Sequence, residues 1–178
     1  MKNLIIVALL LGFSACSTLK VSYDFDKQGK FAAYKTYAFS EETRQLPVGD
    51  LNRDRFIEAV VTEMAAKGFS QSQNPDVVID LRIKADEKTE AYATTMGSPS
   101  FHGGYWRYGY GGGFSSTQIN YDQYVEGTLF INMVDMSTEK IVWQGRGTKT
   151  IDENANATKR ESNINYVVKQ IFTKYPPK

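Results

Sequence analysis

The chain has 178 residues, of which 42% are hydrophobic and 23% are charged, and its formal net charge is +1. This length and composition favour one ordinary globular domain over a disordered, collagen-like or coiled-coil chain. A net charge so close to zero argues against a nucleic-acid-binding protein, which usually carries a strongly basic surface. A single cysteine cannot form an internal disulfide, and a single histidine cannot build a His-rich metal site.

The first sixteen residues have the pattern of a secretory signal sequence. Lys2 gives a positive end, residues 4–13 are an apolar stretch, and Ser14 and Ala15 are small. Ten apolar residues rise about 15 Å as a helix, half of a roughly 30 Å hydrocarbon core, so the stretch does not predict a membrane span. Cleavage after Ala15 would place the bulky Phe13 where ordinary signal cleavage prefers a small residue.

The run Ser14-Ala15-Cys16 resembles the lipobox of bacterial lipoproteins. The resemblance implies that the Cys16 sulfur takes a diacylglyceryl group, that the chain is cut just before it, and that the new amine is acylated. A cysteine suits this chemistry because a thiolate is a strong nucleophile. Phe13 stands where leucine is usual in lipoproteins. The alternative is a buried cysteine within a helix of the mature fold.

We therefore expect a signal peptide at residues 1–15, an acylated cysteine with a short tether at 16–18, and one domain at 19–178. Three extended residues reach at most about 10 Å, so the domain should sit against the membrane. Two or more acyl chains anchor a protein stably. Ser17 is not an aspartate. By the lipoprotein retention rule this implies the periplasmic face of the outer membrane, with the inner membrane and the cell surface as alternatives.

Alternating apolar and polar residues, or aromatic and β-branched runs, predict several β-strands. Residues 40–49, which include Pro47, are expected to form a polar loop. Gly145 and Gly147 within a strand indicate a bulge or a close backbone approach. The expected strands are 19–26, 34–39, 77–84 with an extension to Thr95 left open, 124–135 and 141–148, the last two joined by a hairpin loop at 136–140.

Apolar residues recur at helical spacing in two segments, residues 56–64 and 164–175. Asp50 or Asn52 can cap the first helix, and Gly68 suits the left-handed position beyond its last turn. The order ββαβββα predicts an α+β domain: a mostly antiparallel sheet of about five strands with two helices packed on one face. Thr158 and Glu161 form a capping box at the start of the second helix. Pro176-Pro177 ends that helix.

Several short motifs are distinctive when taken together. The most specific is the hairpin from Glu126 to Gly145 with its return Val142-Trp143-Gln144-Gly145. The motifs span roughly residues 19–175 and resemble an uncharacterised family of bacterial lipoproteins, classed only as a domain of unknown function. The resemblance implies an envelope lipoprotein and transfers no catalytic residue. The other motifs are Tyr23-Asp24 with Phe31, Tyr34–Phe39, Lys67–Phe69 and Asp76–Ile79.

Residues 101–114, within an expected loop at 97–116, consist of glycines and aromatic residues at twelve of fourteen positions. Their rings can stack on sugars, peptides or bases, or lie at a membrane interface. The glycines match neither a P-loop nor a dinucleotide-binding fingerprint. The alternative is an insertion between two strands without a binding role. The candidate binding residues are Phe101, Tyr105, Trp106, Arg107, Tyr108, Tyr110 and Phe114.

No recognisable catalytic constellation is present, so we expect no enzymatic activity, no cofactor and no metal. His102 is the one histidine, and such a residue in a loop is more often solvated than a base. Asp80, Asp86, Glu87 and Glu90 cluster on the third expected strand. Nothing singles out two of them to act across a sugar bond, and a solvated strand face explains them.

The expected function is that of a membrane-anchored envelope lipoprotein, acting as a non-enzymatic interaction or scaffold module. Acyl chains on Cys16 would contact the membrane, and residues 101–114 would contact an envelope protein or a glycan, but no nucleic acid. One alternative is a small envelope hydrolase with paired carboxylates of raised pKa and the aromatic loop as a sugar platform. Another is a carrier of an apolar ligand, which requires an empty apolar cavity beneath the sheet.

Overall fold

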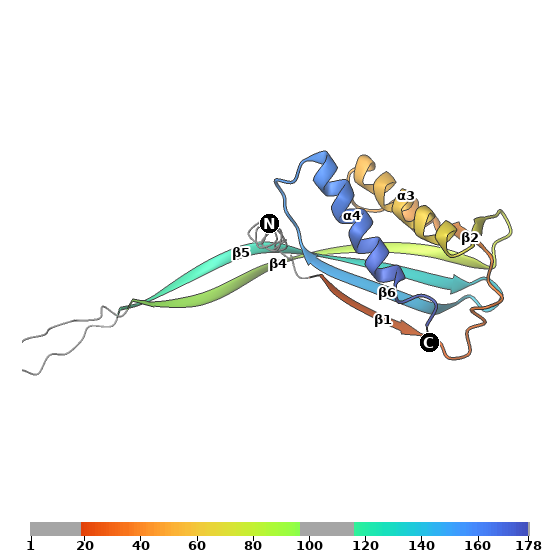
Figure 1. Cartoon of the computed structure of the whole chain (residues 1–178), viewed down its shortest axis with the longest axis horizontal. Helices are drawn as coiled ribbons and strands as arrows, with labels where there is room; N and C mark the ends of the chain where they lie inside the picture. The colour runs from red at the N-terminus through yellow and green to blue at the C-terminus, as the bar shows by residue number, and fades with distance from the viewer. Residues whose placement is uncertain (1–18, 97–115, 178) are drawn as a thin grey trace, which may run out of the picture.

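The computed structural model describes residues 19–96 and 116–177. These residues form a six-stranded sheet in the order β1-β6-β5-β4-β2-β3, with two long helices lying on one of its faces (Figure 1). The fold is therefore of the expected α+β class. The elements are β1 (Lys20–Phe25), β2 (Thr36–Phe39), α2 (Glu41–Arg44), α3 (Asp50–Ala66), β3 (Ser70–Gln71), β4 (Val77–Met96), β5 (Ser116–Asp135), β6 (Lys140–Thr150) and α4 (Ala157–Phe172).

The sheet is mixed rather than almost wholly antiparallel. Strands β1, β6, β5 and β4 pair antiparallel in succession, whereas β2 pairs parallel with both β4 and β3. The parallel pairing arises because α3 carries the chain back across the sheet between β2 and β4, as a crossover connection must. The expected count of about five strands missed β3, whose two residues are too few to show any alternation.

Helix α4 begins two residues earlier than the capping-box pattern predicts. The side chain of Asn156, not Thr158, caps the helix by accepting a hydrogen bond from the Lys159 backbone N–H. Asparagine is at least as good a cap as threonine, and it comes first in the chain. For α3, the cap position is Gly49, ahead of both expected candidates. Beyond α3, Gly68 has a φ of 82°, which confirms the expected left-handed position.

The core lies between the sheet and the two long helices. Trp143 is fully buried, and its ring lies 5.9 Å from that of Phe172 and 5.4 Å from that of Tyr175. Gly145 allows α4 to approach β6, because a Cβ there would lie 2.3 Å from Cγ2 of Ile171. The prediction of a close backbone approach is therefore confirmed at Gly145. The irregular register lies elsewhere, where the β5–β6 pairing shifts after Met133.

The segment at residues 40–49, expected to be a polar loop, contains α2 and a buried threonine. Thr43 is fully buried. Its hydroxyl accepts a hydrogen bond from the Leu81 backbone N–H at 2.8 Å and donates one to the Ile79 carbonyl at 3.3 Å. The Ser40 side chain caps α2 and holds this threonine in place. A side chain thus completes the edge of β4 where β2 ends.

Strands β4 and β5 are each 20 residues long and stay paired along their whole length. Strand β6 accompanies β5 only as far as the Glu126–Thr150 pair. Beyond the Asp86–Glu126 pair, β4 and β5 continue as a two-stranded ribbon that projects from the domain (Figure 1). Ten further pairs extend it by about 33 Å at the usual rise per residue. We define residues 86–96 and 116–126 as the β-arm.

Candidate functional site

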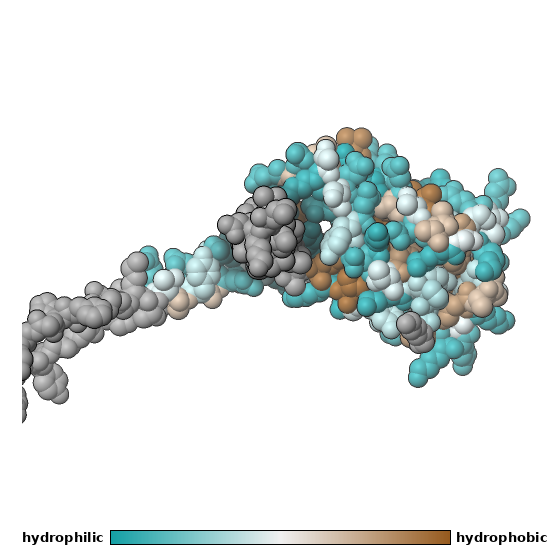
Figure 2. All heavy atoms as spheres, in the orientation of Figure 1, coloured by the Kyte–Doolittle hydropathy of each residue, from teal (hydrophilic) through white to brown (hydrophobic). Residues whose placement is uncertain are grey.

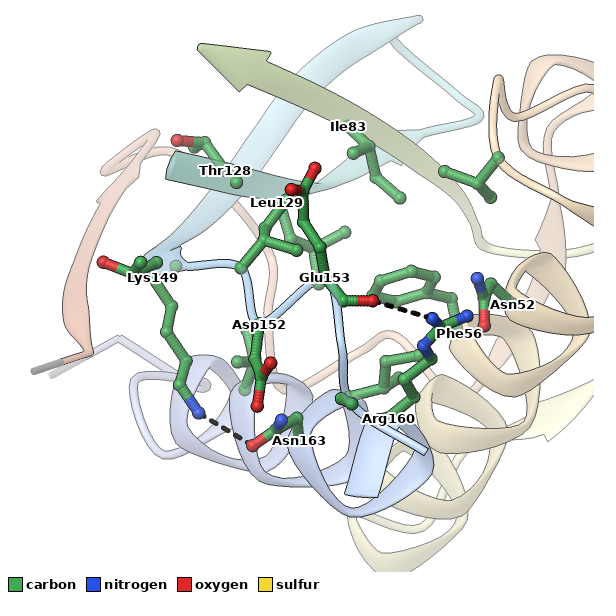
Figure 3. Close-up of a pocket in the computed structure, with 18 residues that line it drawn as sticks. Asn52, Phe56, Ile83, Thr128, Leu129, Lys149, Asp152, Glu153, Arg160 and Asn163 are labelled. Carbon is green, nitrogen blue, oxygen red and sulfur yellow. Dashed lines mark hydrogen bonds between the residues drawn. The ribbon is translucent and has the colours of Figure 1, made fainter. Parts of the chain in front are cut away.

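A pocket opens between the sheet and the N-terminal halves of α3 and α4, at the base of the β-arm (Figure 3). Its volume is about 440 Å³, which falls within the range of about 300–1,000 Å³ common for small-molecule sites. Figure 2 shows apolar surface exposed in this region, between α4 and the sheet. The apolar side chains that line the pocket are Val48, Phe56, Ile83, Leu129, Ile151, Ala155, Ile164 and Val167.

The pocket exists because the core is incomplete at this end of the domain. Leu129 is buried beneath it, but Phe56 of α3 and Ile164 and Val167 of α4 pack against the core while staying partly exposed. Ile151 is 43% exposed where the chain leaves β6. Apolar side chains that face an open space rather than one another offer a surface for an apolar ligand.

Polar and charged groups surround this apolar lining. The Lys149 ammonium donates a 2.8 Å hydrogen bond to Oδ1 of Asn163, and Arg160 donates a 3.1 Å bond to the backbone carbonyl of Glu153 (Figure 3). Within the described part of the chain, neither cation forms an ion pair with a carboxylate. The positive charges of Lys149 and Arg160 therefore stay available to an anionic group.

The acidic side of the rim is partly neutralised. The Lys159 ammonium lies 2.6 Å from the Asp152 carboxylate, and this hydrogen bond lowers the pKa of Asp152. Glu153 is exposed. The lining itself thus carries two cations, Lys149 and Arg160, and two carboxylates, Asp152 and Glu153, and Asp152 is paired with Lys159.

The carboxylates of β4 lie away from this pocket. Asp80 is buried and accepts hydrogen bonds from Ser40, Arg82 and Asn132 at 2.9–3.1 Å, which is a structural network. Asp86 lies 2.8 Å from the Lys84 ammonium, and this hydrogen bond lowers the pKa of Asp86. A lowered pKa is the opposite of what a general acid requires. The other carboxyl groups with lowered pKa are Asp76, Asp135 and Asp152.

Two of the expected sites lie outside the described residues. These are Cys16 and the loop residues Phe101, Tyr105, Trp106, Arg107, Tyr108, Tyr110 and Phe114, together with His102. The structure does place the two ends of that loop, because Met96 pairs with Ser116 at the far end of the β-arm. Across residues 19–96 and 116–177 we find no cluster of three potential metal ligands. The same residues contain no helix long and apolar enough to cross a membrane.

The sequence did not reveal the pocket. Its apolar residues belong to the same periodic patterns that mark the core, and a pattern cannot distinguish a filled space from an open one. The one available signal was Ile151, an apolar residue followed by Asp152-Glu153-Asn154 in a segment to which no pattern assigned an element.

The fold and the pocket define a two-layer α+β domain with an open apolar site. The chain matches the family model described as Domain of unknown function (DUF4136) over residues 21–177, and it belongs to this family. No curated protein matches the chain.

A solved structure with a TM-score above 0.5 shows a similar fold at low sequence identity. A PDZ domain protein from Parabacteroides distasonis ATCC 8503 is 16% identical, with a TM-score of 0.54 over 90% of this chain and 37% of that one. The chain thus spans little more than a third of that protein's length. Two PelC dodecamer structures from Paraburkholderia phytofirmans are 13% and 14% identical, with TM-scores of 0.46 and 0.44. They cover 88% of this chain and 95% and 96% of theirs.

Proposed function

We propose that this protein is a lipid-anchored envelope protein and a non-enzymatic binding module. Its ligand is an amphiphile with one apolar chain and an anionic head group, held in the pocket at the base of the β-arm. The observation that carries this proposal is the pocket itself, of about 440 Å³ and lined by eight apolar side chains. A carrier of an apolar ligand requires such a space.

The apolar lining of the pocket would bind the alkyl chain of this ligand, and the charged residues at its rim would bind the head group. Each methylene that leaves water for an apolar lining contributes about 0.8 kcal/mol, so an alkyl chain supplies affinity. Lys149 and Arg160, without carboxylate partners among the described residues, supply the preference for an anionic head group. A fatty acid is the simplest molecule with both features.

Binding is tested with a soluble chain that starts at Ser17, because the described elements begin only at Lys20. Calorimetric titration with a C16 fatty acid should give saturable one-to-one binding. Val48→Trp should fill the pocket and abolish binding. Val134→Trp is the matched control, because Val134 is also partly exposed but lies on the opposite face of the sheet. Equal binding by both variants would contradict the pocket as the site.

The anchor is the second part of the proposal. The lipobox-like run ending in Cys16 supports acylation and attachment to the periplasmic face of the outer membrane. Replacing Cys16 with alanine should release the protein from the membrane fraction of cells. Unchanged membrane retention of that variant would refute the anchor, whatever the pocket binds.

The loop at residues 101–114 is proposed as a separate contact for an envelope protein or glycan. Its ends are held side by side at the tip of the β-arm by the Met96–Ser116 pair, so its removal should leave the body folded. Deleting 101–114 should abolish partner capture in cross-linking from intact cells. Capture that persists in the deletion variant would exclude the loop as the contact.

A further inference from the structure

We propose that the β-arm lies along the membrane surface, with its apolar side on the lipid. This inference rests on the proposed lipid anchor at Cys16 and on where the structure places the start of β1. It assigns the arm a partner of definite chemistry, the head-group layer of a bilayer.

The first step is the position of the anchor relative to the arm. Lys20, the first residue of β1, pairs with Thr148, which pairs with Thr128, which in turn pairs with Lys84. This row crosses the sheet two residue pairs before the β-arm begins. From Lys20, β1 runs away from the arm, because its last residue, Phe25, pairs with Trp143 at the other end of the body. The anchor therefore joins the domain on the side from which the arm projects.

The second step compares lengths. Four residues lead from Cys16 to Lys20 and reach at most about 14 Å. The six residues of β1 already span about 17 Å, so the anchor cannot reach round to the opposite end of the body. An orientation with the arm pointing away from the membrane is thus excluded. From the Lys84 row, however, the arm's tip is about 40 Å distant. An arm directed straight at the membrane would pass through the head groups into hydrocarbon.

The third step excludes that penetration. Beyond Val125, whose carbonyl accepts a hydrogen bond from the Ile151 backbone N–H, no third strand pairs with the arm among the described residues, so the backbone groups along both outer edges of this part lack partners in the sheet. Such groups are too costly to bury in hydrocarbon. One side of the arm is also strongly charged, and its charged residues are Asp86, Lys88, Glu90, Asp122 and Glu126. The remaining orientation is the one in which the arm lies flat.

The two sides of the arm differ in a way that suits this position. On the charged side, Glu90 and Asp122 pair directly across the strands and accept hydrogen bonds from Tyr124 and Tyr92 at 3.0 and 3.1 Å. Two carboxylates placed opposite each other favour water. The other side carries Glu87 and the polar Thr89–Gln123 pair near the body, and beyond them a small patch that faces solvent. This apolar arm patch consists of Ala91 opposite Tyr121 and Ala93 opposite Ile119.

The patch is well exposed: Tyr121 is 66% accessible and Ile119 is 56% accessible. Tyrosine is enriched at membrane–water interfaces because its ring is apolar while its hydroxyl remains hydrated. Contact with lipid at this patch leaves the Glu90–Asp122 side in water. Tyr92 and Tyr124, which donate hydrogen bonds to these two carboxylates, stay on the water side with them.

The test uses the full lipidated chain in phosphatidylcholine vesicles, with single cysteines labelled by a fluorophore. Acylation consumes Cys16, so an introduced cysteine is the one free thiol. Ala93→Cys and Thr94→Cys are matched neighbours, both exposed and on opposite sides of the arm. Thr138→Cys, in the turn between β5 and β6, reports on the far end of the body. Brominated lipid should quench the label at 93 several-fold more than at 94, and should leave the label at 138 unaffected.

Several outcomes would overturn the inference. Equal, weak quenching at 93 and 94 in protein that still sediments with vesicles would refute the flat arm and leave the anchor standing. Quenching at 138 as strong as at 93 would show the opposite orientation. A disulfide between the 93 positions of two copies of the unlabelled variant under an added oxidant, with no quenching of the labelled one, would make a second copy the occupant of the patch. Failure of the lipidated chain to sediment would refute the anchor and, with it, this inference.

Discussion

The hydroxyl of Tyr34 donates a 2.6 Å hydrogen bond to the Asp135 carboxylate, joining residues that are 101 positions apart. Asp135 ends β5 and is buried, and Ser137 donates to its other oxygen through both its hydroxyl and its backbone N–H, each at 2.6 Å. The hydrogen bond from the Ser137 side chain, followed by the one from Tyr34, lowers the pKa of Asp135 to about 2.

This lowered pKa predicts a specific loss of stability in acid. A carboxyl group with a pKa near 2 when folded and about 3.9 when unfolded contributes its full stabilisation above pH 4. The contribution, about 2 kcal/mol, should then be lost as the pH falls from about 4 to about 2. Urea unfolding across this range should show the loss in the native protein. Asp135→Asn should be less stable at pH 7 and should lack most of this pH dependence; an identical acid profile would contradict the assignment.

Gly145 predicts a large effect from a single methyl group. Its Cβ would lie 2.3 Å from Ile171 and 2.5 Å from the Trp143 ring, both of which are buried. Gly145→Ala should therefore lower the free energy of unfolding by about 1–3 kcal/mol, as overpacked cores do. Gly49 has nothing within 4 Å and occupies a helix cap that lacks a side-chain hydrogen bond. Gly49→Ser should thus be neutral or stabilising by a few tenths of a kcal/mol. Denaturant unfolding of both variants makes the comparison.

Replacing Thr43 should lower the free energy of unfolding because a hydroxyl is lost, even when the size of the side chain is kept. Thr43→Val preserves the shape of the side chain but leaves the Leu81 backbone N–H without its partner. The free energy of unfolding should fall by about 1–3 kcal/mol, the usual cost of an unsatisfied buried donor. Thr43→Ser retains the hydroxyl and should lose less. If valine proved as stable as threonine, the edge of β4 would not depend on this hydroxyl.

The rim of the pocket predicts selectivity for the head group. Lys149→Gln and Arg160→Gln should each weaken binding of a C16 fatty acid by up to about fivefold, since exposed and partly exposed charges are worth about 1 kcal/mol or less. Binding of the uncharged C16 alcohol should change little, because it relies on the apolar lining alone. Raising the salt concentration should narrow the difference in affinity between the acid and the alcohol, because salt screens the two cations. Equal effects on both ligands would mean that the two cations do not recognise charge.

Regular patterns in the sequence predicted the layers of the fold well. The alternation from Val77 and the helical stripe through Val167 and Val168 both correspond to elements of the structure. These predictions succeed because each side of a strand or helix faces either the core or water, and its apolar or polar residues indicate which of the two it faces.

Where the structure differs from the elements expected from the sequence, the cause is local and does not appear in the periodic pattern of the residues. Thr43 is polar and lies in a segment of four helical residues. It is nevertheless buried, because its hydroxyl forms hydrogen bonds with the Ile79 carbonyl and the Leu81 N–H of β4, which a neighbouring strand would otherwise pair. The parallel pairing of β2 depends on the path of the chain rather than on its composition. The β-arm was predicted only in part, since β5 was expected to begin at Tyr124 but begins at Ser116. Strand pairing there continues without burial, so the usual contrast between buried and exposed residues is absent.

The place of β1 in the sheet has a mechanical consequence. It is an edge strand whose only partner among the described strands is β6, and six residue pairs join the two strands. With the lipid anchor proposed at Cys16, tension between the domain and the membrane would enter through Lys20 and would be borne first by these six pairs. Strand β1 would peel away from β6 before the β4–β5 hairpin or the helices felt the load. Strand β1, next to the proposed attachment, is therefore the part of the domain that yields first under force, while the strands and helices around the pocket and the β-arm stay folded.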